Sequence, residues 1–114
     1  MVIIMNMIIK IGKKKLRIKD CKGLSSMRGL MFNKMKNIDG ALIYGNSVWM
    51  PFVKHELDLL FLDKDCKIID IQHAFPMSLK TSSWTVYVNK KAKYCLELKS
   101  GLVNAKKGMK VIII

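Results

Sequence analysis

Apolar side chains recur at every second position in several short runs of this 114-residue chain, and no long stretch repeats them with the period of a helix. In residues 1–11 the odd positions from 3 onward are all Ile or Met, whereas Asn6 and Lys10 stand at even positions. A period of two is typical of β-strands, whose successive side chains point to opposite faces. The sequence therefore predicts a mainly β fold, a compact single-domain β-sandwich or barrel over residues 1–114 with one or two short helices.

Turn residues between these runs predict how the strands connect. The expected hairpins pair residues 1–11 with 14–20 around Gly12, 40–44 with 47–50 around Gly45-Asn46, and 56–62 with 67–75 around 63–66. Further strands are expected at 85–88, 93–98 and 109–114. The short helices are expected at 21–31 and 100–108, with Gly108 ending the second.

The run "ELDLLFL" (56–62) is apolar on both faces of the expected strand, apart from Asp58. Such a strand is typically central and covered on both sides. A carboxylate left unpaired there would be costly, so it needs a cation or several hydrogen-bond donors. We expect Arg28, which precedes the apolar run "GLMF", to pair with Asp58 through its planar guanidinium, with Glu97 as the alternative acid.

Positive charge is concentrated near the start of the chain. Residues 1–36 hold ten Lys or Arg and one acid, a net +9, whereas residues 37–114 hold eleven and seven, a net +4. In "KKKLRIKD" the cations alternate with mostly apolar residues, which predicts a strand with a basic solvent-facing side carrying Lys13, Lys15, Arg17 and Lys19. We expect this strand at a sheet edge, where lysines discourage sheet-to-sheet pairing.

Several classes of protein are disfavoured by the sequence. The three cysteines, Cys21, Cys66 and Cys95, form no CxxC pair, and with only two histidines no metal site or other cofactor is expected. An odd number of cysteines without a signal peptide suits reduced thiols in the cytoplasm. The apolar start is interrupted at Asn6 and is too short for a membrane span, which needs about 20 residues. No glycine-rich phosphate loop occurs either.

Candidate binding residues are polar or aromatic side chains on the expected apolar strands and on the loop 76–84. On a strand, Trp49 and Met50 point to opposite faces, so one of them is free to line a groove. His73 is expected on one face with Ile69 and Ile71. A polar loop on a rigid β scaffold is a common place for recognition. The ligand-binding candidates are Arg28, Trp49, Asp58, His73, Trp84 and Glu97.

Five blocks occur in an order and spacing that resemble one family: "RGLMF" (28–32), "GALIY" (40–44), "VWM" (48–50), "LDLLFLDKD" (57–65) and "KYCLELKSG" (93–101). The chain resembles the domain-of-unknown-function family 192 over about residues 14–112. The resemblance implies a small, mainly β domain of uncharacterised function, without a known reaction or cofactor. The chain departs from the family pattern at Cys66, where the family's Asp-x-Asp-Gly turn has glycine.

Three functions remain open. The preferred one is non-enzymatic binding of a small polar ligand or a protein partner, near Arg28, Trp49, Asp58 and loop 76–84. The second is a weak nucleic-acid-binding accessory protein that uses the basic stretch 10–22, although no aromatic residues interleave with its lysines to stack bases. The third is a hydrolase that uses carboxylates from Asp58, Asp70 and Glu97, or a Cys–His pair.

Overall fold

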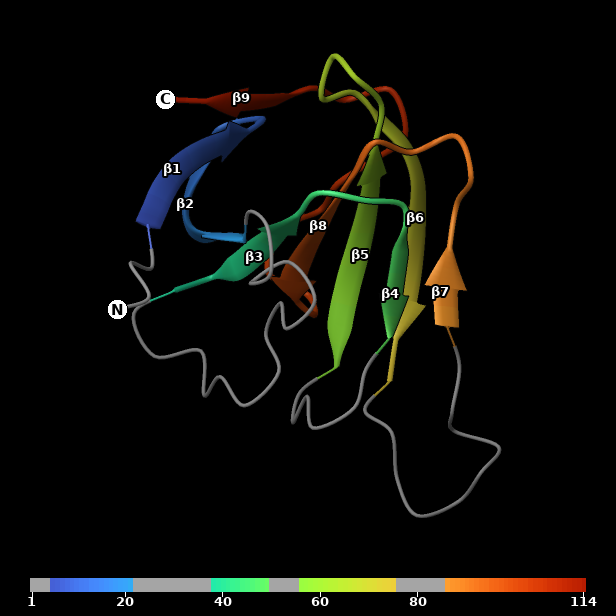
Figure 1. Cartoon of the computed structure of the whole chain (residues 1–114). Helices are drawn as coiled ribbons and strands as arrows, with labels where there is room; N and C mark the ends of the chain where they lie inside the picture. Colours follow the sequence, from blue (N-terminus) through green and yellow to red (C-terminus); the bar gives the residue numbers. More distant parts are fainter. Residues whose placement is uncertain (1–4, 22–37, 50–55, 76–85) are drawn as a thin grey trace.

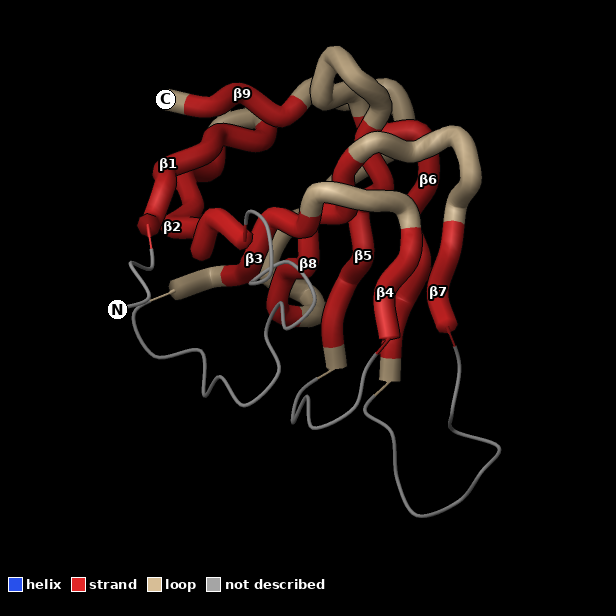
Figure 2. The backbone as a smooth tube through the Cα atoms, in the orientation of Figure 1, coloured by secondary structure: helices blue, strands red, loops and turns tan. Residues whose placement is uncertain are grey.

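Figure 1 shows the computed structural model of the chain, which describes residues 5–21, 38–49, 56–75 and 86–114. The described residues form nine strands and contain no helix, as the tube in Figure 2 makes plain. The mainly β fold class is therefore confirmed. In chain order the strands are β1 (Met5–Ile11), β2 (Lys14–Cys21), β3 (Gly40–Ile43), β4 (Ser47–Trp49), β5 (Leu57–Leu62), β6 (Ile68–Ala74), β7 (Val86–Val88), β8 (Tyr94–Lys99) and β9 (Val111–Ile113).

Seven of these strands make one sheet in the order β6-β5-β8-β3-β2-β1-β9, and β4 and β7 make a second, two-stranded sheet. In the seven-stranded sheet, neighbouring strands run antiparallel, except for β2 and β3, which are parallel. The large sheet curls into a half-barrel, so that β9 crosses near the turn between β5 and β6 (Figure 1). There the Val111 N–H donates to the Cys66 carbonyl oxygen at 2.9 Å, which joins the two ends of the sheet.

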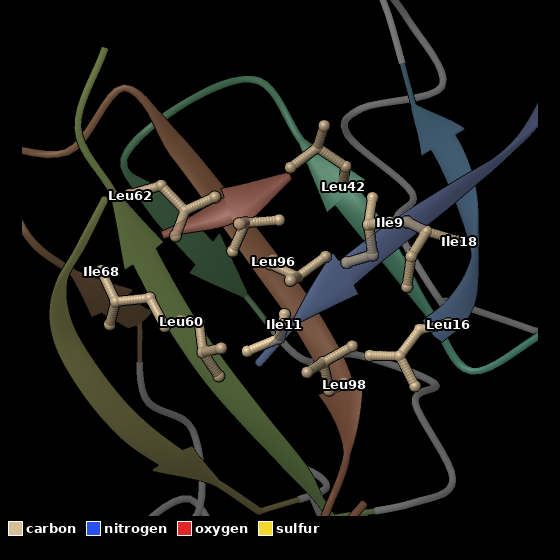
Figure 3. Close-up of a cluster of buried hydrophobic side chains, with 11 residues drawn as sticks. Ile9, Ile11, Leu16, Ile18, Leu42, Leu60, Leu62, Ile68, Leu96 and Leu98 are labelled. Carbon is tan, nitrogen blue, oxygen red and sulfur yellow. The ribbon is translucent and has the colours of Figure 1, made fainter. Parts of the chain in front are cut away.

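The inside of the half-barrel holds one group of buried side chains, here called the inner cluster (Figure 3). It confirms the alternation predicted for the first strand, because Ile9 and Ile11 are buried in it and Met7 packs against it. Burial of each such side chain contributes about 1.5–3 kcal/mol. The inner cluster consists of Ile9, Ile11, Leu16, Ile18, Leu42, Leu60, Leu62, Ile68, Leu96, Leu98 and Val111.

A second group, the outer cluster, covers the opposite face of β3, β5 and β8. Tyr87 of β7 packs against it, which places the small sheet over this face. Strand β5 therefore contributes to both clusters, and its predicted position as a central strand covered on both sides is confirmed. The outer cluster consists of Ala41, Ile43, Leu57, Leu59, Phe61, Ala74, Ala92 and Cys95.

The hairpin predicted around Gly45-Asn46 is wrong. Strand β3 pairs with β2 and β8, whereas β4 pairs with β7, so the chain passes from one sheet to the other at this point. The close approach of β3 to β8 requires the glycine that begins β3. A Cβ atom on Gly40 would lie 2.0 Å from the backbone oxygen of Glu97.

The basic strand does not lie at a sheet edge, contrary to the prediction. β2 is an internal strand because β1 pairs with one of its sides and β3 with the other, and the edge at this end of the sheet is β9. The predicted exposure of the basic side chains agrees with the structure for three of the four residues. Lys13, Lys15 and Arg17 are exposed, and Lys19 is half-buried.

The predicted helix at 100–108 is also wrong, and the one at 21–31 lies outside the described residues except for Cys21. Residues 100–108 form isolated turns, with the Leu102 N–H bonded to the Lys99 carbonyl. Gly101 and Gly108 both have positive φ, at 78° and 94°, which interrupts helical geometry. The segment then bonds to β6 through the Gly108 N–H and the Ile68 carbonyl.

Candidate functional site

The predicted binding residues fall into three groups in the structure. Arg28 and Trp84 lie outside the described residues, so the pairing of Arg28 with Asp58 or Glu97 stays a prediction. For Trp49 only the backbone is described, on β4. Asp58, His73 and Glu97 are described with their side chains, on β5, β6 and β8.

Asp58 and His73 face each other across β5 and β6. Nδ1 of His73 lies 3.0 Å from a carboxylate oxygen of Asp58, and its Nε2 lies 3.3 Å from Glu56. The second oxygen of Asp58 accepts a hydrogen bond from the Gly101 N–H at 3.1 Å. Hydrogen bonding to Asp58, opposed in part by desolvation, raises the pKa of His73. Near the surface, Asp58 is therefore held by two hydrogen-bonding partners, the His73 ring and the Gly101 N–H.

His73 does not share a face with Ile69, because β6 contains a bulge. Phe61 faces Asp70 but the next residue, Leu62, faces Ile68, so Ile69 is an extra residue without a partner on β5. Ile69 consequently packs against the outer cluster. The period of two, from which we predicted a shared face, holds only without such an insertion.

Glu97 is the only buried charged or polar residue among those described, with 2% of its surface exposed. It faces Ala41 on one side and Leu59 on the other, both of which belong to the outer cluster. Lys19 follows in the same cross-strand row, on the far side of Ala41. Desolvation raises the pKa of Glu97 to about 8, and the charge of Lys19 opposes this. Glu97 is thus a neutral carboxylic acid near pH 7.

The carboxylates proposed for hydrolysis do not converge. Asp58 lies on the same face of the sheet as Leu60 and Leu62, whereas Glu97 lies on the opposite face among residues of the outer cluster. The sheet therefore separates the two carboxylates. Asp70 is held elsewhere, by Gln72 at 3.0 Å and by Asn89 at 3.2 Å. Hydrogen bonds from these amides lower the pKa of Asp70.

Neither of the two cysteines whose side chains are described, Cys66 and Cys95, forms a pair with His73. Cys95 is fully buried in the outer cluster, where desolvation raises the pKa of its thiol well above the usual range. His73 lies on the opposite face of the sheet. Cys66 stands in the turn before β6, at the other end of that strand from His73, and desolvation raises its pKa too. Both thiols are free.

Sequence reasoning missed an open cavity of about 520 Å³ beside β2. Asp39 is fixed there by β2, since its carboxylate accepts the Arg17 N–H at 2.8 Å and its own N–H donates to the Arg17 carbonyl at 2.8 Å. The nearby Lys14 ammonium donates to the Leu102 carbonyl at 2.5 Å. The cavity is lined by Ile8, Lys15, Leu16, Arg17, Ile38, Asp39, Lys99 and Leu102.

The basic stretch gave a signal for Lys15 and Arg17, but no sequence signal marked Asp39 or Lys99 as neighbours. Their position depends on the parallel pairing of β2 with β3 and on the pairing of β3 with β8. In the described part of the chain, no group of three or more His, Cys, Asp or Glu side chains could hold a metal ion. The same part of the chain contains no helix that is long and apolar enough to cross a membrane.

Comparison with known proteins gives a family and two similar folds. The model of the family DUF192, Uncharacterized ACR, matches residues 14–113. A crystal structure from Sinorhizobium meliloti 1021, described as a "putative transcription regulator", is 22% identical, with a TM-score of 0.83 over 99% of this chain and 97% of that one. A protein of unknown function from Novosphingobium aromaticivorans DSM 12444 is 20% identical, with a TM-score of 0.76 over 93% and 84%. No curated protein matches the sequence.

Proposed function

Since the chain belongs to the DUF192 family, whose function is uncharacterised, we propose its activity from the geometry alone: non-enzymatic binding of a small anionic ligand in the cavity beside β2. The observation that carries this proposal is the composition of the cavity wall. Three cationic side chains, those of Lys15, Arg17 and Lys99, accompany one carboxylate, that of Asp39. The wall therefore has an excess of positive charge.

The size and the apolar part of the cavity favour a small organic molecule. Its volume of about 520 Å³ lies within the roughly 300–1,000 Å³ of ligand pockets. Four of the eight lining residues are apolar: Ile8, Ile38 and Leu102 are at least partly exposed and would contact the carbon skeleton of the ligand, whereas the side chain of Leu16 is buried in the inner cluster. A carboxylate or phosphate group would meet the cations. An acidic side chain of a protein partner presents the same group and would enter the same open site.

Binding rather than catalysis is favoured because the chemical groups of the described residues are dispersed. Asp58 and Glu97 lie on opposite faces of the sheet, and Cys95 is buried away from His73. His73 and Asp58 are within hydrogen-bond reach of each other, at 3.0 Å, but no described thiol lies beside them as a nucleophile, and neither residue lines the cavity. The cavity, in contrast, has a fixed carboxylate and fixed backbone around its cations.

The experiment is a thermal-shift screen with carboxylate and phosphate metabolites. A ligand at 100 times its dissociation constant should add about 2.7 kcal/mol to the free energy of unfolding. Lys99→Gln should weaken the response, because it removes a cation of the cavity. Lys91→Gln, at an exposed turn position away from the cavity, is the matched control and should respond as the wild type does. No stabilisation by any anion, or equal responses of both variants, would refute the proposal.

Weak nucleic-acid binding is the second candidate, because Lys13, Lys15 and Arg17 are exposed side by side. The description of one similar structure as a regulator of transcription favours the same reading. Binding through phosphates alone should fall steeply as salt rises, with little preference between sequences. We would measure affinity for random RNA and DNA at several salt concentrations. An absence of binding at low salt would remove this candidate.

A further inference from the structure

The outer face of β1, β2 and β9 carries cations and isoleucines in adjacent rows. In one row Arg17 faces Ile8, whose carbonyl accepts the Ile114 N–H at 2.9 Å. In the next row Lys15 faces Lys10, and Lys10 faces Ile112. Cations thus lie toward β2 and isoleucines toward β9. We call this surface the lysine–isoleucine face, made of Ile8, Lys10, Lys15, Arg17, Ile112 and Ile114.

The isoleucines on this face do not contribute to either core cluster. Ile8 is 46% exposed, Ile112 is 53% exposed and Ile114 is 64% exposed. Large exposed apolar side chains that adjoin one another often mark an interaction surface. Their neighbours Ile9 and Ile11 point the other way, into the inner cluster. In the described part of the fold Ile8 also lines the cavity beside β2, whereas Ile112 and Ile114 belong neither to a core cluster nor to the cavity lining.

The cations on the face also lack a structural reason. Lys10 and Lys15 lie directly opposite each other on antiparallel strands, an arrangement that destabilises a sheet unless an anion is present. Asp39 lies beside Arg17, to whose backbone it is hydrogen-bonded, but no acidic residue is paired with Lys10 or Lys15 in their row. Five of the eight acids of the chain instead lie in residues 56–70, on and around the hairpin of β5 and β6. The surface charge is thus separated, and an anionic plane would attract the lysine–isoleucine face first.

We propose that the lysine–isoleucine face docks on an anionic lipid surface, an interaction beyond the binding of a small ligand in the cavity. A bilayer offers both complements at once: phosphates at the level of the lysines, and acyl chains just beneath for the isoleucines. Nucleic acid would match the cations, but the bases of single strands stack on aromatic side chains, and this face has none. A second copy of the face would meet its own positive charge.

The experiment is vesicle flotation of the full chain. Vesicles of phosphatidylcholine are compared with vesicles in which about a third of the lipid is phosphatidylglycerol, at low and at physiological salt. The wild type should float with the anionic vesicles only, and less at higher salt. Failure to bind anionic vesicles at low salt, or equal binding to both kinds, would overturn the proposal.

Two variants test the two halves of the face separately. Lys10→Gln with Lys15→Gln should lower partitioning by about fivefold per lysine, or about thirtyfold together. The matched control, Lys64→Gln with Lys91→Gln, makes the same charge change at exposed turn positions outside the lysine–isoleucine face. An equal loss in the control would mean that net charge alone drives binding, which overturns the proposal.

The second variant, Ile112→Ser with Ile114→Ser, should lower partitioning while leaving its salt dependence in place. Val88→Ser, at a position that is 45% exposed on β7, is the apolar control and should bind as the wild type does. Lys99→Gln should not change vesicle binding, which separates this proposal from the cavity. If the isoleucine variant binds vesicles normally and duplex RNA displaces the protein from them, the face recognises polyanions and the lipid proposal is wrong.

Discussion

The Glu97→Gln substitution should stabilise the protein increasingly as the pH rises. Glu97 is 2% exposed, and its desolvated carboxyl has a pKa of about 8, against an ordinary value of 4.5. Below about pH 4.5 the group is protonated in both the folded and the unfolded chain, so its ionisation does not affect stability. Between those two values the unfolded chain releases the proton and the folded chain keeps it. The free energy of unfolding therefore falls as the pH rises.

The size of this effect follows from the two pKa values. The gap between 4.5 and about 8 corresponds to about 5 kcal/mol, at about 1.4 kcal/mol for each pH unit. That is comparable with the whole stability of many small domains, about 5–15 kcal/mol. Gln has a similar shape and stays neutral at every pH. The variant should therefore equal the wild type near pH 4.5 and exceed it by about 5 kcal/mol near pH 9.

Urea denaturation of both proteins from pH 4.5 to 9 measures this difference, because all other groups titrate equally in the two chains. Asp65→Asn, which removes an exposed carboxylate, is the control for the loss of one negative charge. A Glu97→Gln protein that is less stable than the wild type at pH 8 would refute the reasoning. That result would mean that a cation pairs with ionised Glu97, as in the alternative to the predicted Arg28–Asp58 pair.

Three further predictions concern other residues. Gly40→Ala should lower the free energy of unfolding by about 3 kcal/mol or more, because its Cβ would collide with a backbone oxygen on β8. Gly45→Ala, with open space around it, should be nearly neutral, and melting curves of the two variants test the difference. In the native protein a thiol reagent should modify half-buried Cys66 before Cys95, which is fully buried; equal rates would contradict the buried position. The stability that His73 gains from its two carboxylates should be complete below about pH 6.5 and decline as the pH rises through its raised pKa. The melting temperature of the wild type should then approach that of His73→Gln between pH 6 and 9, and a constant gap would disprove this.

The individual strands were largely predictable from local alternation, but their partners were not. Leu57, Leu59 and Phe61 on one face, with Leu60 and Leu62 on the other, indicated a strand buried on both faces, and β5 is one. The turn at Gly45-Asn46 indicated a hairpin, and the chain instead changes sheets there. Sequence periodicity gives the faces of a strand, whereas pairing is decided by contacts between residues far apart along the chain.

The candidate site shows the same division. Asp58 was singled out as the acid on an apolar strand, with Glu97 as the alternative partner for Arg28, whereas among the described residues Glu97 is the buried acid and Asp58 is half-buried. The bulge at Ile69 could not be recognised in the alternating sequence pattern, so the neighbours predicted for His73 were partly wrong. The cavity brings Arg17, Asp39 and Lys99 together from three parts of the chain, and no local pattern links them.

The pairing of β1 with β9 has a consequence for how the chain folds. Ile9 pairs with Ile113, and Gly40 pairs with Leu98, so much of the sheet depends on contacts that close very long loops. Such high contact order slows folding, to milliseconds or seconds in β proteins. The hairpin of β1 and β2 can form early from local contacts, but its outer edge has no partner until residues 111–113 arrive. During synthesis, β1 must therefore leave the ribosome with this edge open, exposed to any other unpaired strand nearby.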